Sequence, residues 1–426
     1  MALSSLEFIL LFLPLALLAY LFSPEKMRNL SLFILSLIFY AWAEPVYIFL
    51  LVFLIFLTYG LGLVIDRCDD QGKKKFIFIL GLSLSLLPLV FYKYYGFMID
   101  IVNGIFRSNL KIKDLPLPLG LSFYSFKIVS YLSDLYRGRV EVEKNFLDLG
   151  LYLAVFPQIG AGPITRYEDF RPDLKKRKIT TMDLGEGMER FILGLAKKAI
   201  LADNFALIWT QVKATPNYKF SFAMGWLGIL SFGLQLYFDF SGYSDMALGL
   251  GQMMGFHWDE NFNYPYTATS IKDFWSRWHI SLGTWFRTYI YIPLGGSRVD
   301  GLREIRNLFI VWGLTGLWHG ASLSFIVWGL YFGVLLLFER KLGRKIFKDL
   351  PVKLKQVGTF ILVLIGWVFF ALDGLVDGLL YISRMFGYRT TGFLGKDFFY
   401  LFKSNFLLLV LGLLATTPLV GGVLEK

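Results

Sequence analysis

The sequence is poor in the residues that most often bind metals or form covalent cross-links. It contains one cysteine and three histidines among 426 residues. A single cysteine excludes an intrachain disulfide and any multi-cysteine metal site, and we interpret Cys68 as a small residue near a membrane interface. The three histidines have no cysteine or glutamate at ligand spacing, so we predict no metal site.

Other familiar signatures are also missing. There is no phosphate-binding loop, no dinucleotide fingerprint and no serine-nucleophile elbow, so the usual machinery of soluble enzymes is absent. No internal repeat is visible, which weakens a secondary-transporter interpretation. The N-terminus has no basic region before its first apolar run, so we expect residues 6–22 to be a retained membrane span and not a cleaved signal peptide.

Apolar residues are abundant instead. Hydrophobic residues make up 56% of the chain and aromatic residues 18%, and the mean hydropathy is +0.56. These values are typical of a polytopic membrane protein. The formal net charge of +11 comes from basic residues between apolar segments. Membrane orientation and anionic headgroups explain that pattern better than nucleic-acid binding does.

The apolar segments predict an all-α protein with about ten or eleven transmembrane helices, besides re-entrant and interfacial ones. They are residues 6–22, 30–42, 46–65, 76–92, 119–136, 191–209, 222–240, 308–338 (interrupted), 357–372 and 406–420. The basic loops at 26–28, 67–75, 171–178 and 340–355 should face the cytoplasm, which places the N-terminus outside. Residues 156–163 are too broken for a straight span and should be buried in protein or line a cavity.

His319 is the first candidate for chemistry. It follows 11 apolar-segment residues that begin at Leu308, about 16 Å of helix, which is half of a hydrocarbon core. A titratable side chain near the bilayer midplane, beside a glycine that permits a break, suggests catalysis or transport within the membrane. The alternative is a buried histidine in a close helix crossing, since Gly316 and Gly320 match a small-residue packing pattern.

Two further clusters carry polar side chains. The helical period predicts one interfacial amphipathic helix over 270–287, with Phe274, Trp278 and Trp285 on one face. Asp273 and Arg277 are spaced as a favourable pair, and this helix could hold His279 near a cavity mouth. Residues 237–245 either line a substrate passage at the end of an apolar helix, or cap a helix start through Ser241 or Ser244. We interpret His257 as structural.

The ordered motifs resemble the membrane-bound O-acyltransferase (MBOAT) family, in its bacterial alginate O-acetyltransferase branch. The matching segments are residues 117–126, 156–158 with 161–167, 237–245, 260–266, 273–281, 291–296 and 316–320. They span about two thirds of the chain in the expected order. Branch members often continue beyond the position that matches Lys426.

The resemblance implies a funnel-shaped helical membrane fold in one integral-membrane domain, residues 1–426. Its parts would be N-terminal spans (1–110), a motif-bearing core (111–338) and C-terminal spans (339–426). The resemblance maps the family's catalytic histidine onto His319 and its second polar position onto His279. It also implies a bacterial cytoplasmic membrane, acetyl-CoA as the cytoplasmic donor, no bound cofactor, and an extracellular partner transferase that acetylates an exported polysaccharide.

We hypothesise that His319 takes the proton from an attacking hydroxyl, while His279 positions a reactant or relays a proton. Three cationic residues are candidates for binding the phosphates of acetyl-CoA: Lys272, Arg277 and Arg287. Further candidates for substrate binding are Trp318, Asp239, Tyr243, Asp245 and Asn263.

Three other functions stay open from the sequence. D-alanyl transfer to teichoic acid would use the same fold and histidine with a carrier-protein thioester, and no docking surface for a carrier protein is visible. A transporter or flippase for an acyl donor or polymer unit is disfavoured by the missing repeats. A catalytically silent scaffold is disfavoured by the presence of both His279 and His319.

Overall fold

The computed structural model describes residues 2–111, 115–343 and 346–419. Within these ranges the chain is helical, with one isolated bridge between Phe262 and Trp278 and no strand. The contacts divide the chain into two compact units. Unit 1 contains the described residues up to Leu195 and Tyr243–Glu260, and unit 2 contains Ala196–Gly242 and the described residues from Asn261 onward. The predicted all-α class is confirmed.

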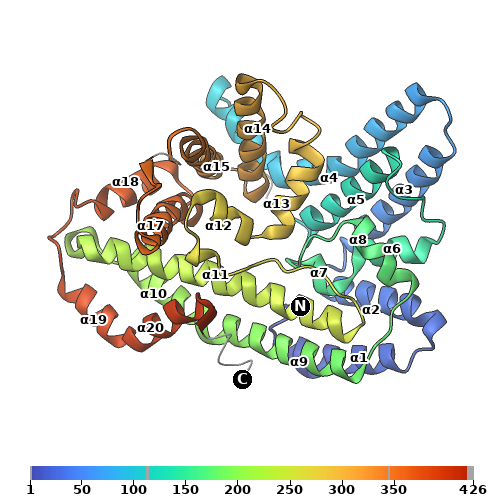
Figure 1. Ribbon diagram of the computed structural model, residues 1–426, viewed down its shortest axis with the longest axis horizontal. Coiled ribbons are helices and arrows are strands. Elements are labelled where there is room, and N and C mark those ends of the chain that lie inside the picture. The colour runs from blue at the N-terminus through green and yellow to red at the C-terminus, as the bar shows by residue number, and fades with distance from the viewer. Residues whose placement is uncertain (1, 112–114, 344–345, 420–426) are drawn as a thin grey trace. The chain divides into compact units, whose positions relative to one another are not determined.

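Unit 1 is built from the N-terminal helices (Figure 1). They are the π-helical turn η1 (Phe8–Phe12), α1 (Leu13–Leu21), α2 (Arg28–Ala43), α3 (Ile48–Asp66), α4 (Gln71–Phe106), α5 (Leu121–Tyr136), α6 (Phe146–Ala154), α7 (Phe156–Ile159), α8 (Tyr167–Lys175) and most of α9 (Thr181–Ala196). Helix α3 contacts α4, α5 and α6, and α2 contacts α1 and α6.

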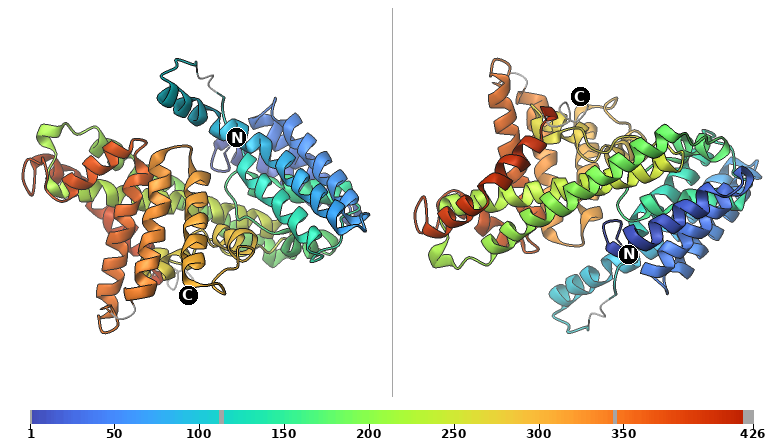
Figure 2. Two further views of the ribbon diagram at one scale, coloured as in Figure 1. Left: turned by 90° about the horizontal axis from the view of Figure 1, so that it is seen from above. Right: turned by 90° about the horizontal axis from the view of Figure 1, so that it is seen from below.

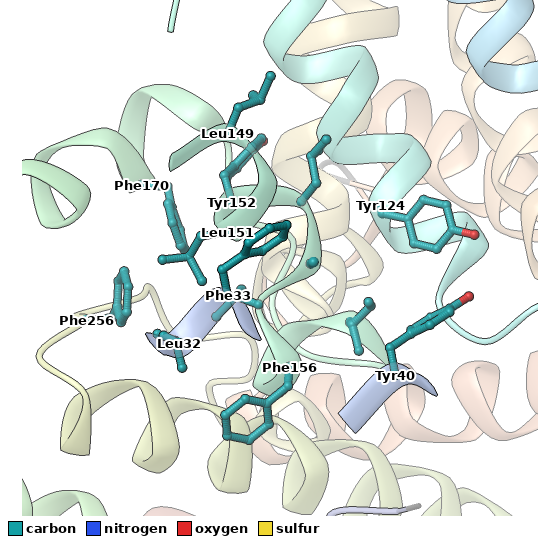
Figure 3. Packing of buried hydrophobic residues seen from close by; sticks show 14 of the residues in the cluster. Leu32, Phe33, Tyr40, Tyr124, Leu149, Leu151, Tyr152, Phe156, Phe170 and Phe256 are labelled. Atoms are coloured by element: carbon teal, nitrogen blue, oxygen red, sulfur yellow. The ribbon is translucent and has the colours of Figure 1, made fainter. Parts of the chain in front are cut away.

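The core of unit 1 is rich in aromatic residues. Figure 3 shows Phe33 of α2, Tyr124 of α5, and Tyr152 of α6 in one cluster, and all three are buried. Phe156 of α7 lies in the same core with no exposed surface. The backbone around α7 is therefore covered by protein, as the broken motif at 156–163 predicts for non-helical chain in a membrane protein.

Unit 2 contains the remaining helices. They are η3 (Lys197–Ala202), α10 (Asp203–Lys213), α11 (Phe222–Met253, with its last eleven residues in unit 1), α12 (Ile271–Arg277), α13 (Ile280–Phe286), η6 (Arg287–Tyr291), α14 (Gly301–His319), α15 (Leu323–Phe338), η7 (Glu339–Gly343), α17 (Val352–Ala371), α18 (Leu375–Met385), α19 (Lys396–Ser404) and α20 (Phe406–Ala415). Helix α15 packs against both α14 and α17, and Figure 2 shows these three orange helices side by side.

Four helices in the described ranges are long and apolar enough to cross a membrane: α3, α4, α15 extended through η7, and α17. Helices α19 and α20 make a fifth if the pair, bent by 62°, forms one span. Several other predicted spans correspond to shorter helices, such as α2 and α5 with 16 residues each. The chain is thus a multi-pass membrane protein.

Two local predictions are wrong. Residues 237–245 do not end or start a helix, because α11 continues to Met253, so neither Ser241 nor Ser244 is a cap. The single amphipathic helix predicted over 270–287 is interrupted at Trp278 and His279, which separate α12 from α13. A third prediction is confirmed, since α14 ends at His319 and extended backbone follows at Gly320.

Candidate active site

The break between α12 and α13 gives His279 its position. The amide of Asn263 donates to the carbonyl of Arg277 (3.0 Å), and the amide of Ile280 donates to the carbonyl of Asn261 (3.0 Å). These two bonds pair residues 261–263 with the start of α13. His279 has a φ of 47°, the left-handed conformation that side chains other than glycine adopt infrequently. The motif at 260–266 therefore holds the histidine where a continuous helix would not.

Asn261 orients the imidazole of His279. Its Oδ1 lies 3.1 Å from His279 Nδ1 and accepts hydrogen bonds from the Ser281 amide (3.2 Å) and hydroxyl (2.9 Å). Because this oxygen is an acceptor, Nδ1 carries the proton and Nε2 keeps its lone pair. Nε2 is buried without a hydrogen-bond partner among the described residues.

Burial also determines the charge of this ring. His279 is 2% exposed and lies outside the spanning helices named above. Desolvation lowers the pKa of His279 to about 3, so the ring is neutral at physiological pH. A neutral imidazole with a fixed tautomer and a free lone pair can accept a hydrogen bond from a reactant, whereas its low pKa makes it a weak proton acceptor at physiological pH.

His319 lies at the end of α14 in an aromatic surrounding. Its ring centroid is 4.9 Å from that of Trp328 and 5.0 Å from that of Phe370. Trp318 contacts both histidines, with ring centroids 6.0 Å from His279 and 4.6 Å from His319. The structure thus brings the two imidazoles, 40 positions apart in the chain, around one indole.

Close packing of α14 against α15 supports this arrangement. A Cβ atom on Gly316 would lie 2.3 Å from the carbonyl oxygen of Phe325, and one on Gly320 would lie 2.2 Å from the Phe325 ring. Both glycines are therefore needed for packing, as the small-residue pattern predicts. The packing interpretation and the catalytic one are compatible, because the tight crossing fixes the end of the helix that carries His319.

A cavity of about 520 Å³ adjoins His279. Trp275, Trp312 and Leu308 are among its apolar lining residues, and Lys272 and Arg287 contribute two cations. Arg287 begins the π-helical turn η6, a widened turn often found at functional sites. An apolar wall with two cations suits a ligand that joins an acyl thioester to an anionic group.

The other predicted binding residues have separate partners. Arg277 Nε donates to Asp273 Oδ1 at 2.7 Å, which confirms the predicted pair. Asp239 Oδ1 lies 2.8 Å from Lys198 Nζ. Asn263 contributes its backbone to the bridge described above. Tyr243 and Asp245 belong to unit 1, where Asp245 Oδ1 accepts from Arg190 at 3.1 Å. Their roles in substrate binding stay predictions.

Asn261 is a site residue that was not predicted from the sequence. It lies in one of the motifs that carry the family resemblance. However, its contact with His279 joins residues 18 positions apart in the sequence, so it arises only in the folded chain. His257 is exposed beside Asp183, where Nε2 and Oδ1 are 3.2 Å apart, and its structural role stays a prediction. Among the described residues, no group of three or more metal-binding side chains lies close enough to hold an ion.

Similarity to known proteins identifies the family of this chain. Residues 34–376 match the model of the MBOAT, membrane-bound O-acyltransferase family. The chain is 41% identical to a probable alginate O-acetylase of Pseudomonas aeruginosa, covering 92% of this chain and 76% of the relative. It is 36% identical to a peptidoglycan O-acetyltransferase of Helicobacter pylori, covering 89% and 79%.

A more distant relative has a different acyl group. The chain is 30% identical to a teichoic acid D-alanyltransferase of Bacillus subtilis, covering 71% of this chain and 79% of the relative. All three relatives transfer acyl groups, and the family match covers most of the chain, including both histidines. The chain therefore belongs to the membrane-bound O-acyltransferase family and is an acyltransferase.

Proposed function

We propose that this protein takes an acetyl group from cytoplasmic acetyl-CoA for the O-acetylation of an exported cell-surface polysaccharide. The more similar relatives are named for acetylation of alginate or peptidoglycan. The acetyl group would reach the polymer through an extracellular partner transferase. The whole chain would act as one domain in the bacterial cytoplasmic membrane, with its N-terminus outside and no bound cofactor.

The observation that carries this proposal is the contact of Trp318 with both imidazoles, together with a cavity that His279, Lys272 and Arg287 line. In the proposed reaction, a hydroxyl oxygen attacks the carbonyl carbon of the thioester and gives its proton to His319. The carbon–sulfur bond breaks, and CoA leaves as a thiolate that is then protonated. The neutral ring of His279 orients a reactant or relays the proton through Nε2.

The cations have a separate role in this proposal. Lys272 and Arg287 line the cavity and would pair with the phosphates of CoA. Arg277 lies on the same short helix as Lys272, but it is already paired with Asp273, so we expect a smaller contribution from it. Trp318 would form part of the wall that excludes water between the two imidazoles.

D-alanyl transfer from a carrier protein is the second candidate, because one relative is named for it. That relative shares lower identity and less of this chain than the acetylating relatives do. An acetyl donor is therefore the better supported one. Both reactions use a thioester and a hydroxyl, so the donor must be identified by experiment.

The test uses purified protein in nanodiscs with acetyl-CoA radiolabelled in the acetyl group, and a D-alanyl carrier protein in a parallel assay. CoA release and label transfer are followed for the wild type, His319→Ala and His257→Ala. We expect His319→Ala to lower CoA release by ~10²–10⁴-fold, the range for loss of a general base. His257→Ala removes an exposed histidine that pairs with Asp183 and should leave the rate within about twofold, since substitutions of exposed side chains usually have small effects.

Turnover with the carrier protein alone would replace the acetyl donor by a D-alanyl one. Normal turnover by a well-folded His319→Ala protein would refute the assignment of the base. If acetyl-CoA is not consumed even with the extracellular partner present, the proposed reaction is wrong.

A further inference from the structure

Unit 1 contains a second cavity, of about 500 Å³, that the acyl-transfer chemistry does not use. Three chain segments line it: residues 25–30 at the start of α2, 145–148 at the start of α6, and 174–178 at the end of α8. Six of the lining side chains are cationic: Lys26, Arg28, Lys175, Lys176, Arg177 and Lys178. Only Glu25 and Asp148 oppose them, which leaves an excess of four positive charges.

One of the two carboxylates is already neutralised. Asp148 Oδ2 lies 2.8 Å from Lys175 Nζ, and Asp148 Oδ1 accepts from Asn29 Nδ2 at 2.6 Å. Lys175 also contacts Glu143, 3.0 Å away. In the part of the chain that the structure describes, no ion pair joins a carboxylate to Lys26, Arg28 or Lys178. The cavity therefore holds cations in excess of their protein partners.

Two guanidinium groups of the cavity lining have buried nitrogen atoms that lack a hydrogen-bond acceptor. Arg28 Nε and Arg177 Nη2 are both inaccessible to water and have no hydrogen-bond partner among the described residues. Arg177 is held firmly, because its Nε donates to the Tyr20 hydroxyl (2.9 Å) and its Nη1 donates to the Asp173 carbonyl (3.1 Å). Buried donors of this kind are normally satisfied, and an anion in the cavity would supply the missing acceptor.

Aromatic packing and helix geometry add to this argument. The Arg177 guanidinium lies over the ring of Phe256, 4.3 Å from its centroid, and Figure 3 shows Phe256 in the core of unit 1. Helix α2, 16 residues long, begins at Arg28 without a side-chain cap. Its first turn presents the positive end of the helix dipole to the same cavity, where an anion is favoured.

We propose that this cavity binds the phosphate of an anionic ligand, as the headgroup of an acidic phospholipid or as a soluble phosphate. Guanidinium groups suit the planar, paired acceptor atoms of a phosphate. Residues 25–30 join two apolar segments, and the basic loops here are those expected at the cytoplasmic face. We therefore expect the lipid headgroup to be the source, since anionic lipids of that leaflet attract such loops.

The test measures ligand binding by the purified full-length chain in neutral detergent, by native mass spectrometry. The probes are phosphatidylglycerol, phosphatidylcholine of the same acyl chains, and inorganic pyrophosphate. We compare the wild type with Arg28→Gln/Lys178→Gln, and with Lys73→Gln/Lys75→Gln at the exposed start of α4 as a control that removes the same charge. Size-exclusion chromatography and CoA release establish that both variants are folded.

We expect the wild type to bind phosphatidylglycerol at least tenfold more tightly than phosphatidylcholine. The Arg28→Gln/Lys178→Gln variant should lose at least tenfold in affinity, and the α4 control less than twofold. Binding of pyrophosphate alone, lost in the same variant, would support the phosphate site and identify a soluble source. Equal losses in both variants would overturn the proposal, because the binding would then follow net charge. No preference for phosphatidylglycerol and no pyrophosphate binding would also overturn it.

Discussion

Two buried titratable side chains, Glu143 in unit 1 and His279 in unit 2, have different surroundings. In unit 1, Glu143 accepts from the Asn145 amide (2.9 Å) and the Tyr167 hydroxyl (2.7 Å), and it pairs with Lys175. In unit 2, His279 is equally buried, yet one ring nitrogen has a single partner, Asn261, and the other has none among the described residues. Full satisfaction of Glu143 indicates a structural role, whereas the free lone pair of His279 indicates a group that meets a ligand.

The pKa values follow the same difference. Burial raises the pKa of Glu143, but the hydrogen bonds from Asn145, Tyr167 and Lys175 together lower it by more than burial raises it. The pKa of Glu143 is therefore below its usual value. The stability that this carboxylate contributes is present at neutral pH and is lost as the pH falls through its folded pKa. For His279, burial is the cause that lowers the pKa, and Nε2 has no acceptor among the described residues that would favour the protonated ring. Polar partners thus stabilise the charged form of Glu143 in unit 1, whereas burial stabilises the neutral form of His279 in unit 2.

Among the variants that test this comparison, the largest effect on activity should come from His279→Asn. Asparagine accepts the left-handed backbone at this position, so the fold should be retained, with a change in unfolding free energy of about 1 kcal/mol or less. Acetyl-CoA turnover should fall by ~10²–10⁴-fold because the ring nitrogen is lost. CoA release and thermal unfolding in detergent measure the two effects. A large loss of stability with near-normal turnover of the folded fraction would show that His279 stabilises the fold and does not act in the reaction.

The opposite behaviour is expected for Glu143→Ala. The substitution removes the acceptor of the buried Tyr167 hydroxyl, while Lys175, whose side chain is 45% exposed, keeps Asp148 as a partner. An unsatisfied buried donor costs about 1–3 kcal/mol, and the half-exposed Lys175 adds little to this loss. Denaturant titration in mixed micelles should show this loss. Turnover per folded molecule should stay within about twofold of the wild type. Loss of turnover in protein that remains folded would contradict the structural role of Glu143.

An intermediate effect is expected for Asn261→Asp, which places a carboxylate at the His279 Nδ1 atom. In the wild type, a pKa of about 3 keeps the ring neutral from pH 5 to 8, so His279 contributes no acid limb to the rate profile. A neighbouring negative charge favours the protonated ring and raises its pKa. Turnover of the variant should therefore fall as the pH drops from 8 to 5.5, because the protonated fraction of the ring increases, while the wild type shows no such fall from this group.

Asn261→Ala is the matched control for that profile. It removes the orienting oxygen without adding charge, so it should lower turnover at every pH without a new acid limb. Identical pH profiles for the two variants would show that the charge of His279 does not limit the reaction.

The smallest effect is expected at the cavity cations. Lys272→Gln or Arg287→Gln removes one contact to the donor's phosphates, and an exposed charge contact contributes about 1 kcal/mol. The KM for acetyl-CoA should rise about 3–10-fold, with kcat within about twofold. Lys213→Gln, at the exposed end of α10, is the control and should leave both constants unchanged. An unchanged KM for acetyl-CoA in both variants would show that Lys272 and Arg287 do not bind the phosphates of the donor.

Local patterns predicted the helices well, and the site less well. The break after His319 was predictable because a glycine follows it directly. The break at Trp278 and His279 was not, because a regular apolar period runs through it. The cause lies in residues 261–263, whose backbone bonds to residues 277–280 arise only in the folded chain. The same limit applies to Ser241, whose hydroxyl-rich motif suggested a cap although α11 continues past it.

The left-handed backbone at His279 has a consequence for any randomised library at this position. Glycine, asparagine, aspartate and histidine tolerate a positive φ better than β-branched or bulky residues do. Selection would therefore act twice, first for chains that can fold and then for chains that can react. Clones that are folded and inactive should be enriched in asparagine, aspartate and glycine, and histidine should stand alone among the active ones.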